Sequence, residues 1–280
     1  MAPARKVVLC ADDYGLTEGV SRGILELAEA GRISATSAMA TMPDWPRLAP
    51  ALRPFRGRIG VGLHINFTTA APLGALPRLA PEGRLPALAG LLRAALTSGL
   101  DPREIRAELD RQIDAFAEAY GGPPDFVDGH QHVHVLPVIR PALLEALRER
   151  GLQGRLWLRD PSDGVRPILR RELSARKALI VKALALGFRR AARTTGFDTN
   201  EGFSGFSPFD LTIPPERVFG QALLSLGPKP LVMAHPGYAD ESLRALDPEV
   251  DSRPQELAYL KSEAFGRLLK ERGLVLASRP

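Results

Sequence analysis

The sequence predicts an α/β protein built as one (β/α) barrel, and three observations support this fold class. Short apolar runs alternate with helical patterns along the chain, which is typical of parallel strands joined by crossover helices. Polar, ligand-type residues follow five of these runs, whereas an open sheet would gather them at one switch point. The length of 280 residues suits a single domain over 1–280.

The expected elements alternate from the N-terminus, beginning with the strand KVVLCADD. The apolar runs predict strands within 6–13, 33–43, 57–67, 125–137, 154–163, 194–206, 230–238 and 273–278. The helical patterns predict helices at 18–31, 102–122, 139–150, 166–193, 214–226 and 254–272. A Pro/Gly-rich excursion over 71–100 interrupts this alternation, and we expect it on the substrate side of the barrel.

The composition is ordinary for a soluble globular protein, with 45% hydrophobic and 25% charged residues. The single cysteine, Cys10, excludes an internal disulfide framework and is expected to be a buried, small apolar residue. The N-terminus has no signal-peptide pattern, and the apolar stretch 178–188 is too short to span a bilayer. These features predict a cytoplasmic protein.

The basic residues are concentrated in 166–193, which we interpret as a basic helix. This segment has nine cations and one acid, Glu172, so its net charge is +8 in a chain of formal charge +5. Its apolar residues would let it lie on an anionic membrane surface, and a solvated outer helix is the more common alternative. Only one aromatic residue, Phe188, accompanies the cations, so no nucleic-acid partner is expected.

All five histidines fall at the ends of predicted strands, where a barrel assembles its active site. Histidine and carboxylate side chains together can hold a divalent cation and leave positions open for water and substrate. This pattern predicts a metal site rather than scattered structural histidines. The histidines are His64, His130, His132, His134 and His235.

The stretch HQHVH predicts three histidines on one side of an extended chain, because residues two apart share a face. Three are more than one ion needs beside an aspartate, so some of His130, His132 and His134 would hold a neighbouring ligand or the substrate. The spacing alone leaves open which ones do so.

Two adjacent acids, Asp12 and Asp13, end the first strand. A cation would make one carboxylate its ligand and leave the other as a base. His235 lies in MAHPGY and could act as a general acid, because the pKa of an unperturbed histidine lies near neutral pH. Arg159 could orient Asp12, contact a sugar hydroxyl or pair with Asp160 or Asp163.

The motifs ADDYG, GLHINF, DGHQHVH and MAHPGY, in this order, resemble those of the YdjC-like carbohydrate deacetylases. That family includes chito-oligosaccharide deacetylases and the deacetylase associated with hopanoid biosynthesis. EGFSGF at 201–206 also fits, and the resemblance extends from Lys6 to the terminal strand. Tyr14 stands where the family more often has phenylalanine, so its hydroxyl is a candidate substrate contact.

The resemblance implies a deformed (β/α) barrel that hydrolyses the N-acetyl group of an amino sugar. The substrate would be a chito-oligosaccharide or a lipid-linked N-acetylglucosamine. It further implies one divalent ion, Mg²⁺ or Zn²⁺, held by Asp13, His64 and His130. Asp12 would then be the general base and His235 the general acid, while His132 and His134 would contact substrate or support a ligand.

Other functions fit the sequence less well. An amidohydrolase-type barrel would carry its H-x-H pair on the first strand, where this chain has acids. An Fe(II) oxygenase shares the ligand types but usually has a double-stranded β scaffold. A serine hydrolase lacks its G-x-S-x-G motif, because Gly205 directly follows Ser204. A non-catalytic module that binds sugar or metal is the alternative outside enzymes.

Overall fold

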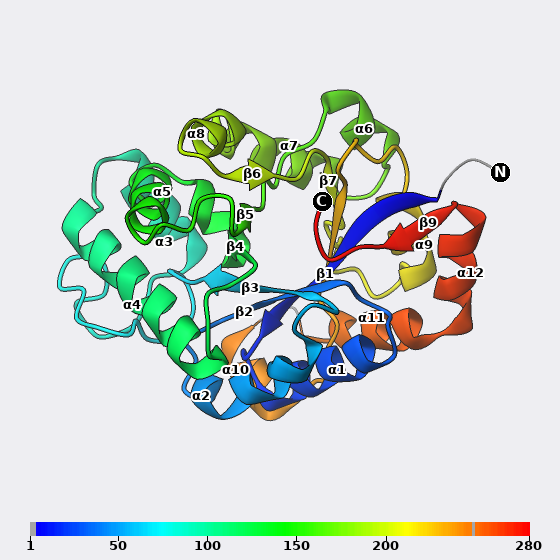
Figure 1. The fold of residues 1–280 in the computed structure, drawn as a ribbon, viewed down its shortest axis with the longest axis horizontal. Helices are drawn as coiled ribbons and strands as arrows, with labels where there is room; N and C mark the ends of the chain where they lie inside the picture. The colour runs from blue at the N-terminus through cyan, green and yellow to red at the C-terminus, as the bar shows by residue number, and fades with distance from the viewer. Residues whose placement is uncertain (1–3, 248–249) are drawn as a thin grey trace.

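The structure is a computed structural model that describes residues 4–247 and 250–280. Its strands form one parallel sheet in the order β6-β5-β4-β3-β2-β1-β8-β7, with β9 beside the beginning of β1. The sheet is curled, with helices around it (Figure 1). The strands are β1 Arg5–Tyr14, β2 Ala35–Ala38, β3 Gly60–Ile65, β4 Phe126–Gly129, β5 Trp157–Leu158, β6 Asp198–Thr199, β7 Phe203–Ser204, β8 Leu231–Ala234 and β9 Leu274–Leu276.

The helices follow the strands in the alternation that the sequence predicts. In the first half they are α1 Glu18–Glu29, α2 Trp45–Leu48, the 3₁₀ helix η1 Ala49–Phe55, α3 Leu88–Leu96, α4 Pro102–Tyr120, the 3₁₀ helix η2 His130–Val135 and α5 Ile139–Glu149. In the second half they are α6 Val165–Arg170, α7 Ala175–Leu184, α8 Phe188–Thr194, α9 Pro215–Ala222, α10 Glu241–Leu246, α11 Ser252–Lys261 and α12 Glu263–Glu271.

The barrel has a seam between β6 and β7, the two ends of the strand order. No ladder joins these two strands in the described residues. The amide of Asn200 lies at the seam: its Oδ1 accepts from Asp160 N at 2.7 Å, and its Nδ2 donates to the carbonyls of Asp160 and Gly202 at 2.9 and 3.0 Å. The predicted deformed (β/α) barrel is therefore confirmed, with a seam at which the short link 200–202, and no ladder among the described residues, joins β6 to β7.

Helix α4 anchors the excursion over 71–100. Its buried apolar stripe packs on the core, and the buried carboxylate of Glu108 accepts a hydrogen bond from Leu73 N at 2.9 Å. Glu104 accepts similarly from Arg78 N at 2.9 Å. The excursion is thus held in place by hydrogen bonds, and it contributes α3, a helix that the sequence analysis did not predict.

The basic segment 166–193 forms three short helices, so its interpretation as one helix is wrong. Ser174 has φ 58° and Gly187 has φ 79°, and these left-handed residues end the helical path on either side of α7. The predicted helix at 254–272 is also divided, because Ser262 leaves the α conformation and caps α12 by accepting from Phe265 N at 3.3 Å.

The side chains of β1 divide the core into two sets, as expected for alternating residues of a strand. Val7, Leu9 and Ala11 pack toward the helices. Val8 and Cys10 pack with Phe126 and Trp157 from β4 and β5 and with neighbouring residues of β7 and β8, in the interior of the barrel. The expectation that Cys10 is a buried apolar residue is confirmed, since it is 0% exposed.

Candidate metal centre and active site

A polar layer caps the apolar interior at the carboxyl ends of the strands. Asp12 follows Cys10 by two residues, Asp128 follows Phe126, and Arg159 follows Trp157, so the alternation of each strand turns these side chains toward one another. Six strands and the residues that directly follow them supply this layer. It consists of Asp12, Ser37, His64, Asp128, Arg159 and His235.

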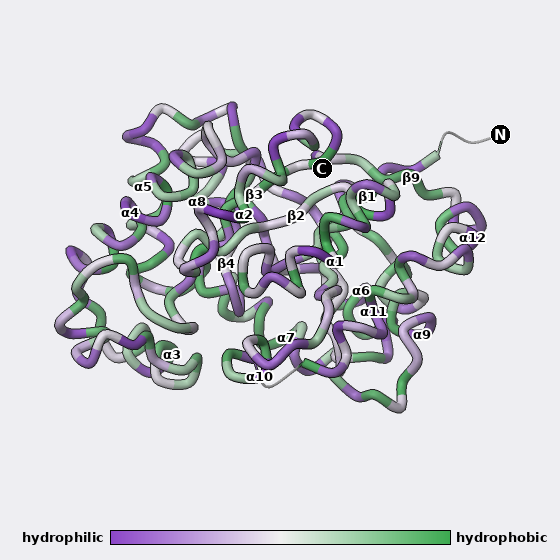
Figure 2. Tube along the Cα trace, turned by 90° about the horizontal axis from the view of Figure 1, so that it is seen from below, coloured by the Kyte–Doolittle hydropathy of each residue, from purple (hydrophilic) through white to green (hydrophobic). Residues whose placement is uncertain are grey.

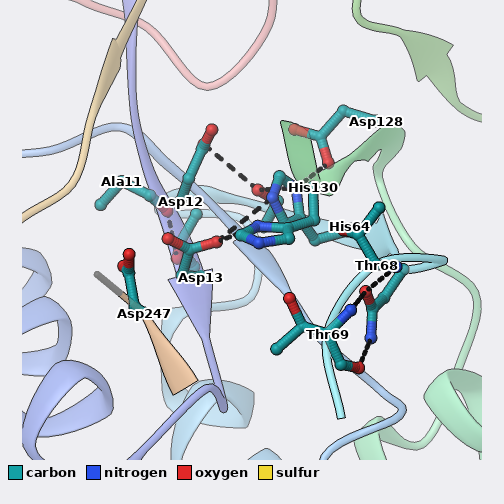
Figure 3. A network of polar contacts seen from close by, with 12 residues as sticks. Ala11, Asp12, Asp13, His64, Thr68, Thr69, Asp128, His130 and Asp247 are labelled. Atoms are coloured by element: carbon teal, nitrogen blue, oxygen red, sulfur yellow. Dashed lines mark hydrogen bonds and ion pairs between the residues drawn. The ribbon is translucent and has the colours of Figure 1, made fainter. Parts of the chain in front are cut away.

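Asp13 joins this layer only because the backbone departs from strand geometry. The β1–β2 register shifts between Ala11 and Tyr14, and Asp13 has φ 72°, a conformation that residues with a Cβ adopt at a cost. The irregularity brings the carboxylate of Asp13 near His64 and His130, and Figure 3 shows all three converging. The strained backbone conformation of Asp13 therefore positions its carboxylate beside the two histidines.

Asp13, His64 and His130 can hold one metal ion. Asp13 Oδ1 lies 3.3 Å from His64 Nε2 and 3.0 Å from His130 Nδ1, and a ligand atom from each residue lies within 4.8 Å of the others. Two imidazole nitrogens and one carboxylate oxygen suit Zn²⁺ and related divalent ions, and Mg²⁺ prefers more oxygen ligands. The donor set fits the cation that the sequence predicts.

Further residues orient the ligands. His64 Nδ1 donates to Asp128 Oδ1 at 2.6 Å, which directs Nε2 toward Asp13. Although burial lowers the pKa of His64, the Asp128 carboxylate raises it to about 10 in the metal-free protein. On the other side, Arg253 Nη2 donates to Asp13 Oδ2 at 2.6 Å and also to Asp247. One oxygen of Asp13 thus faces the histidines and the other faces Arg253.

Asp12 forms a two-point pair with Arg159 at distances of 2.6 and 2.7 Å. Arg159 also contacts Asp128 Oδ2 at 2.6 Å, so one buried guanidinium lies between two buried carboxylates. Burial alone would raise the pKa of Asp12, but the charge of Arg159 holds it below its usual range. Asp12 is therefore an ionised carboxylate beside the candidate metal ligands.

His235 follows β8 directly and lines the same cavity as Asp12 and Asp13. Its backbone N–H donates to Glu256 Oε2 at 2.7 Å, whereas its buried Nδ1 has no hydrogen-bond partner among the described residues. Burial lowers the pKa of His235 to about 4, against the charges of Asp13 and Asp12, which raise it. The imidazole is thus neutral at pH 7 in the metal-free protein and has a nitrogen available for a ligand.

The extended arrangement predicted for HQHVH is wrong. Residues 130–135 form η2, and Gln131 and His132 are left-handed with φ 52° and 61°, so the three histidines point to different neighbours. His130 faces Asp13, and His132 lines the cavity with its ring against Phe203. His134 is fully buried and its Nε2 donates to the carbonyl of Arg159 at 2.8 Å.

The structure contradicts the role suggested for Tyr14 and shows the partners of Arg159 and His134. Tyr14 does not contact the cavity: it is buried, and its hydroxyl donates to the carbonyl of Leu48 at 2.8 Å, so its predicted contact with substrate is wrong. Arg159 contacts Asp12 rather than Asp160, which pairs with Arg189 instead. His134 lies behind Arg159 and outside the cavity wall.

A cavity of about 1040 Å³ opens above the polar layer. The candidate ligands, Asp12 and His235 line its floor, and helices α3 and α7 contribute apolar side chains to its walls. The excursion and the basic segment therefore both border the site. The apolar wall residues of these two helices are Leu88, Ala89, Leu92, Ile180, Val181 and Leu184.

Sequence reasoning missed several residues that support the site. None of Asp128, Ser37, Arg253 and Glu256 was assigned a role from the sequence. Asp128 and Ser37 follow interior residues by two positions, so strand alternation could have identified both. Arg253 comes from α11 and matches no local pattern, so only the tertiary structure identifies it.

Comparison with known proteins agrees with these motifs. The family model described as YdjC-like protein matches residues 6–271. The chain belongs to the YdjC-like family. Within the family's relatives, a human protein named carbohydrate deacetylase is 30% identical over 260 residues, which cover 84% of this chain and 76% of the human one. A Serratia marcescens protein named chitooligosaccharide deacetylase is 30% identical over 277 residues and covers 97% of each chain.

The fold also matches a solved structure. A crystal structure from Enterococcus faecalis, provisionally assigned to cellobiose-phosphate cleavage, superposes with a TM-score of 0.73 over 98% of this chain and 97% of that one, at 22% identity. At this level of sequence identity, the similarity shows that the two chains share a fold. No helix among the described residues has the length and apolar character needed to cross a membrane. The cytoplasmic location stays a prediction.

Proposed function

We propose that this YdjC-like protein is a metal-dependent hydrolase that removes the N-acetyl group from an N-acetylated amino sugar and releases acetate. The observation that carries the proposal is the convergence of Asp13, His64 and His130 in one cavity with Asp12 and His235. The names of the relatives, carbohydrate deacetylase and chitooligosaccharide deacetylase, support the same reaction class.

Asp13, His64 and His130 would hold the divalent cation. When bound, such an ion supplies Lewis-acid polarisation of a carbonyl and lowers the pKa of water. Asp128 orients the imidazole of His64, and Arg253 orients the carboxylate of Asp13. Two imidazole ligands favour Zn²⁺ over Mg²⁺ as the native ion.

Asp12 and His235 would move the protons of the hydrolysis. Asp12 is ionised and can accept a proton from the attacking water, while Arg159 fixes the direction of its carboxylate. His235 would donate a proton to the nitrogen of the leaving amine. Because His235 is neutral in the metal-free protein, it would first take up the proton that Asp12 accepts from water, and the negative charges of Asp12 and Asp13 would stabilise the imidazolium that forms. As the C–N bond breaks, the water oxygen becomes the second carboxylate oxygen of acetate, and the two protons of the water end on the nitrogen of the amine, which leaves as an ammonium group.

The walls of the cavity support a lipid-linked amino sugar over a long chito-oligosaccharide. Sugar chains bind through polar groups and aromatic faces, whereas the walls from α3 and α7 are aliphatic apart from Arg176 and Lys177, and Phe209 is the one Phe, Tyr or Trp among the described lining residues. The polar floor suits a sugar and its acetamide, and the aliphatic walls suit an apolar aglycone. We therefore propose an N-acetylglucosamine joined to an apolar group as the substrate class.

Acetate release tests the proposed function. The protein would be assayed with N-acetylglucosamine, a chito-oligosaccharide and an alkyl N-acetylglucosaminide, each with and without a chelator. We expect chelator-sensitive release, fastest with the alkyl glycoside. Metal binding without any acetate release would favour a non-catalytic binding module. Release that a chelator does not reduce would contradict the metal-dependent mechanism.

A further inference from the structure

Two segments without acidic residues flank the mouth of the cavity. Residues 83–100 contain two cations and no Asp or Glu, and residues 173–197 contain six cations and no Asp or Glu, although the whole chain has 32 acids. Helix α3 lies in the first segment and α7 in the second, and both line the cavity. In Figure 2, α3, α7 and α10 lie along the same lower edge of the molecule.

The outward side of each helix is apolar and cationic. On α3 the exposed residues include Arg93 and Leu96, and on α7 they include Arg176 and Ile180, which also line the cavity. Leu96 is 64% exposed and Ile180 is 53% exposed. Leu186, just after α7, is 79% exposed. The solvent side of an ordinary surface helix is polar, so two such stripes beside one opening indicate a contact surface.

The cations of these stripes differ from others in the basic segment. Arg171 is buried, pairs with Asp163 and donates to three backbone carbonyls, and Arg189 pairs with Asp160. These cations are internal supports of the fold. Arg93 and Arg176 are exposed and have no ion-pair partner among the described residues, so their charges are available to an anionic partner.

We propose that the mouth of the cavity docks on the surface of an anionic lipid bilayer. Leu96 and Ile180 would enter the headgroup region, and Arg93 and Arg176 would contact lipid phosphates. The combination of exposed aliphatic and basic side chains fits this partner. Exposed aromatic residues, which nucleic-acid surfaces use, are absent from both described stripes. A bilayer at this position would present an amphiphilic substrate to the cavity, a consequence that rests on the proposed function; the docking itself does not.

Co-sedimentation with vesicles tests the docking. The probes are vesicles of phosphatidylcholine alone and of phosphatidylcholine with phosphatidylglycerol, at low salt, with the full chain. The test variant replaces Arg93→Gln and Arg176→Gln together. The matched control replaces Arg148→Gln and Arg190→Gln, which line a separate groove between α5 and α8 and change the net charge equally.

We expect the unmodified protein to bind the anionic vesicles and not the neutral ones. The test variant should bind about 25-fold more weakly, and the control variant should remain within about twofold of the unmodified protein. Leu96→Asp with Ile180→Asp should weaken binding further, with circular dichroism confirming that each variant is folded. None of these readouts depends on acetate release, so failure of the proposed deacetylase activity would leave the docking result unaffected.

Three results would overturn the docking surface. The first is that the unmodified protein does not bind anionic vesicles. The second is that the control variant loses as much affinity as the test variant, which would indicate diffuse attraction by net charge. The third is a dimer in light scattering that Leu96→Asp with Ile180→Asp dissociates, which would assign the stripes to a second copy of this chain.

Discussion

Arg159 holds Asp12 through two hydrogen bonds of 2.6 and 2.7 Å between side chains that are 0% and 1% exposed. The same guanidinium reaches Asp128, which in turn holds His64. The proposed base and one proposed metal ligand are therefore oriented by a single buried cation. His134 supports that cation from behind through the carbonyl of Arg159.

Asp12→Asn should abolish most of the activity and leave metal binding intact. The amide cannot accept the proton of the attacking water, so turnover should fall by about 10²–10⁴-fold. Steady-state acetate release and a metal titration of the same sample would measure both effects. Asp13→Asn is the contrasting variant, since it should lose the metal. Unchanged turnover in Asp12→Asn would contradict the assignment of the base.

Arg159→Leu should destabilise the protein strongly. It leaves Asp12 and Asp128 as buried carboxylates without their cation, which costs about 3–5 kcal/mol of unfolding free energy. Urea unfolding would measure this loss. Adding Asp12→Asn to Arg159→Leu should recover part of it, because one uncompensated charge is removed. If the double variant is no more stable than Arg159→Leu, the pair of Arg159 and Asp12 contributes less to the free energy of unfolding than its geometry indicates.

Arg253→Lys should weaken metal binding while keeping the positive charge. Lysine cannot span both Asp13 and Asp247 as the guanidinium does, so Asp13 loses its fixed orientation. Loss of such a supporting contact typically lowers metal affinity by about 10–100-fold. Isothermal titration would measure the change, with Arg244→Lys, which pairs with Asp251 on the surface, as the control. Equal affinities in the two variants would remove Arg253 from the site.

Tyr14→Phe should leave activity unchanged and reduce stability slightly. Its hydroxyl bonds the carbonyl of Leu48 rather than the cavity, so the cost is that of one buried hydrogen bond, about 0.5–1.5 kcal/mol. Substrate kinetics and urea unfolding would measure the two quantities separately. A rise in KM would show that the hydroxyl contacts substrate after all.

The stability of the metal-free protein should be greatest near pH 6.5. Below this pH the unfolded chain takes up protons at His132, His134 and His235, because burial lowers the pKa of all three, to about 4 for His134 and His235. Glu256 opposes them, since burial raises its pKa to about 7. Above pH 6.5 the folded chain retains a proton on His64, whose pKa of about 10 exceeds the unfolded value, and this stabilisation disappears as the pH rises toward 10.

Urea unfolding with chelator at pH 5, 6.5 and 9 would measure this dependence. For each proton by which the folded and unfolded chains differ, the unfolding free energy changes by about 1.4 kcal/mol per pH unit. His134→Gln keeps a donor for the carbonyl of Arg159, so it should reduce the loss at pH 5 and leave the loss at pH 9. A stability that rises steadily from pH 5 to 9 would contradict the assigned protonation of His64.

The sequence allowed the barrel and the converging polar strand ends to be predicted, because both depend on periodicity. The alternation that places Asp12, Asp128 and Arg159 over an apolar layer is visible in the strands themselves. The path of HQHVH was not predictable, since the left-handed Gln131 and His132 depend on packing around η2. Arg253 was also missed, because nothing near it in sequence indicates that α11 reaches Asp13. Local patterns identified the strand-borne groups, and tertiary contacts supplied the rest.

At the seam, the contacts among the ends of β5, β6 and β7 depend on the side chain of Asn200. Backbone ladders persist through almost any substitution, whereas the carboxamide of Asn200 makes three contacts here, two with Asp160 after β5 and one with Gly202 before β7. Aspartate would lose the two donated bonds and alanine would lose all three. A single substitution at Asn200 would therefore loosen the link between β6 and β7 without altering any group that performs the chemistry.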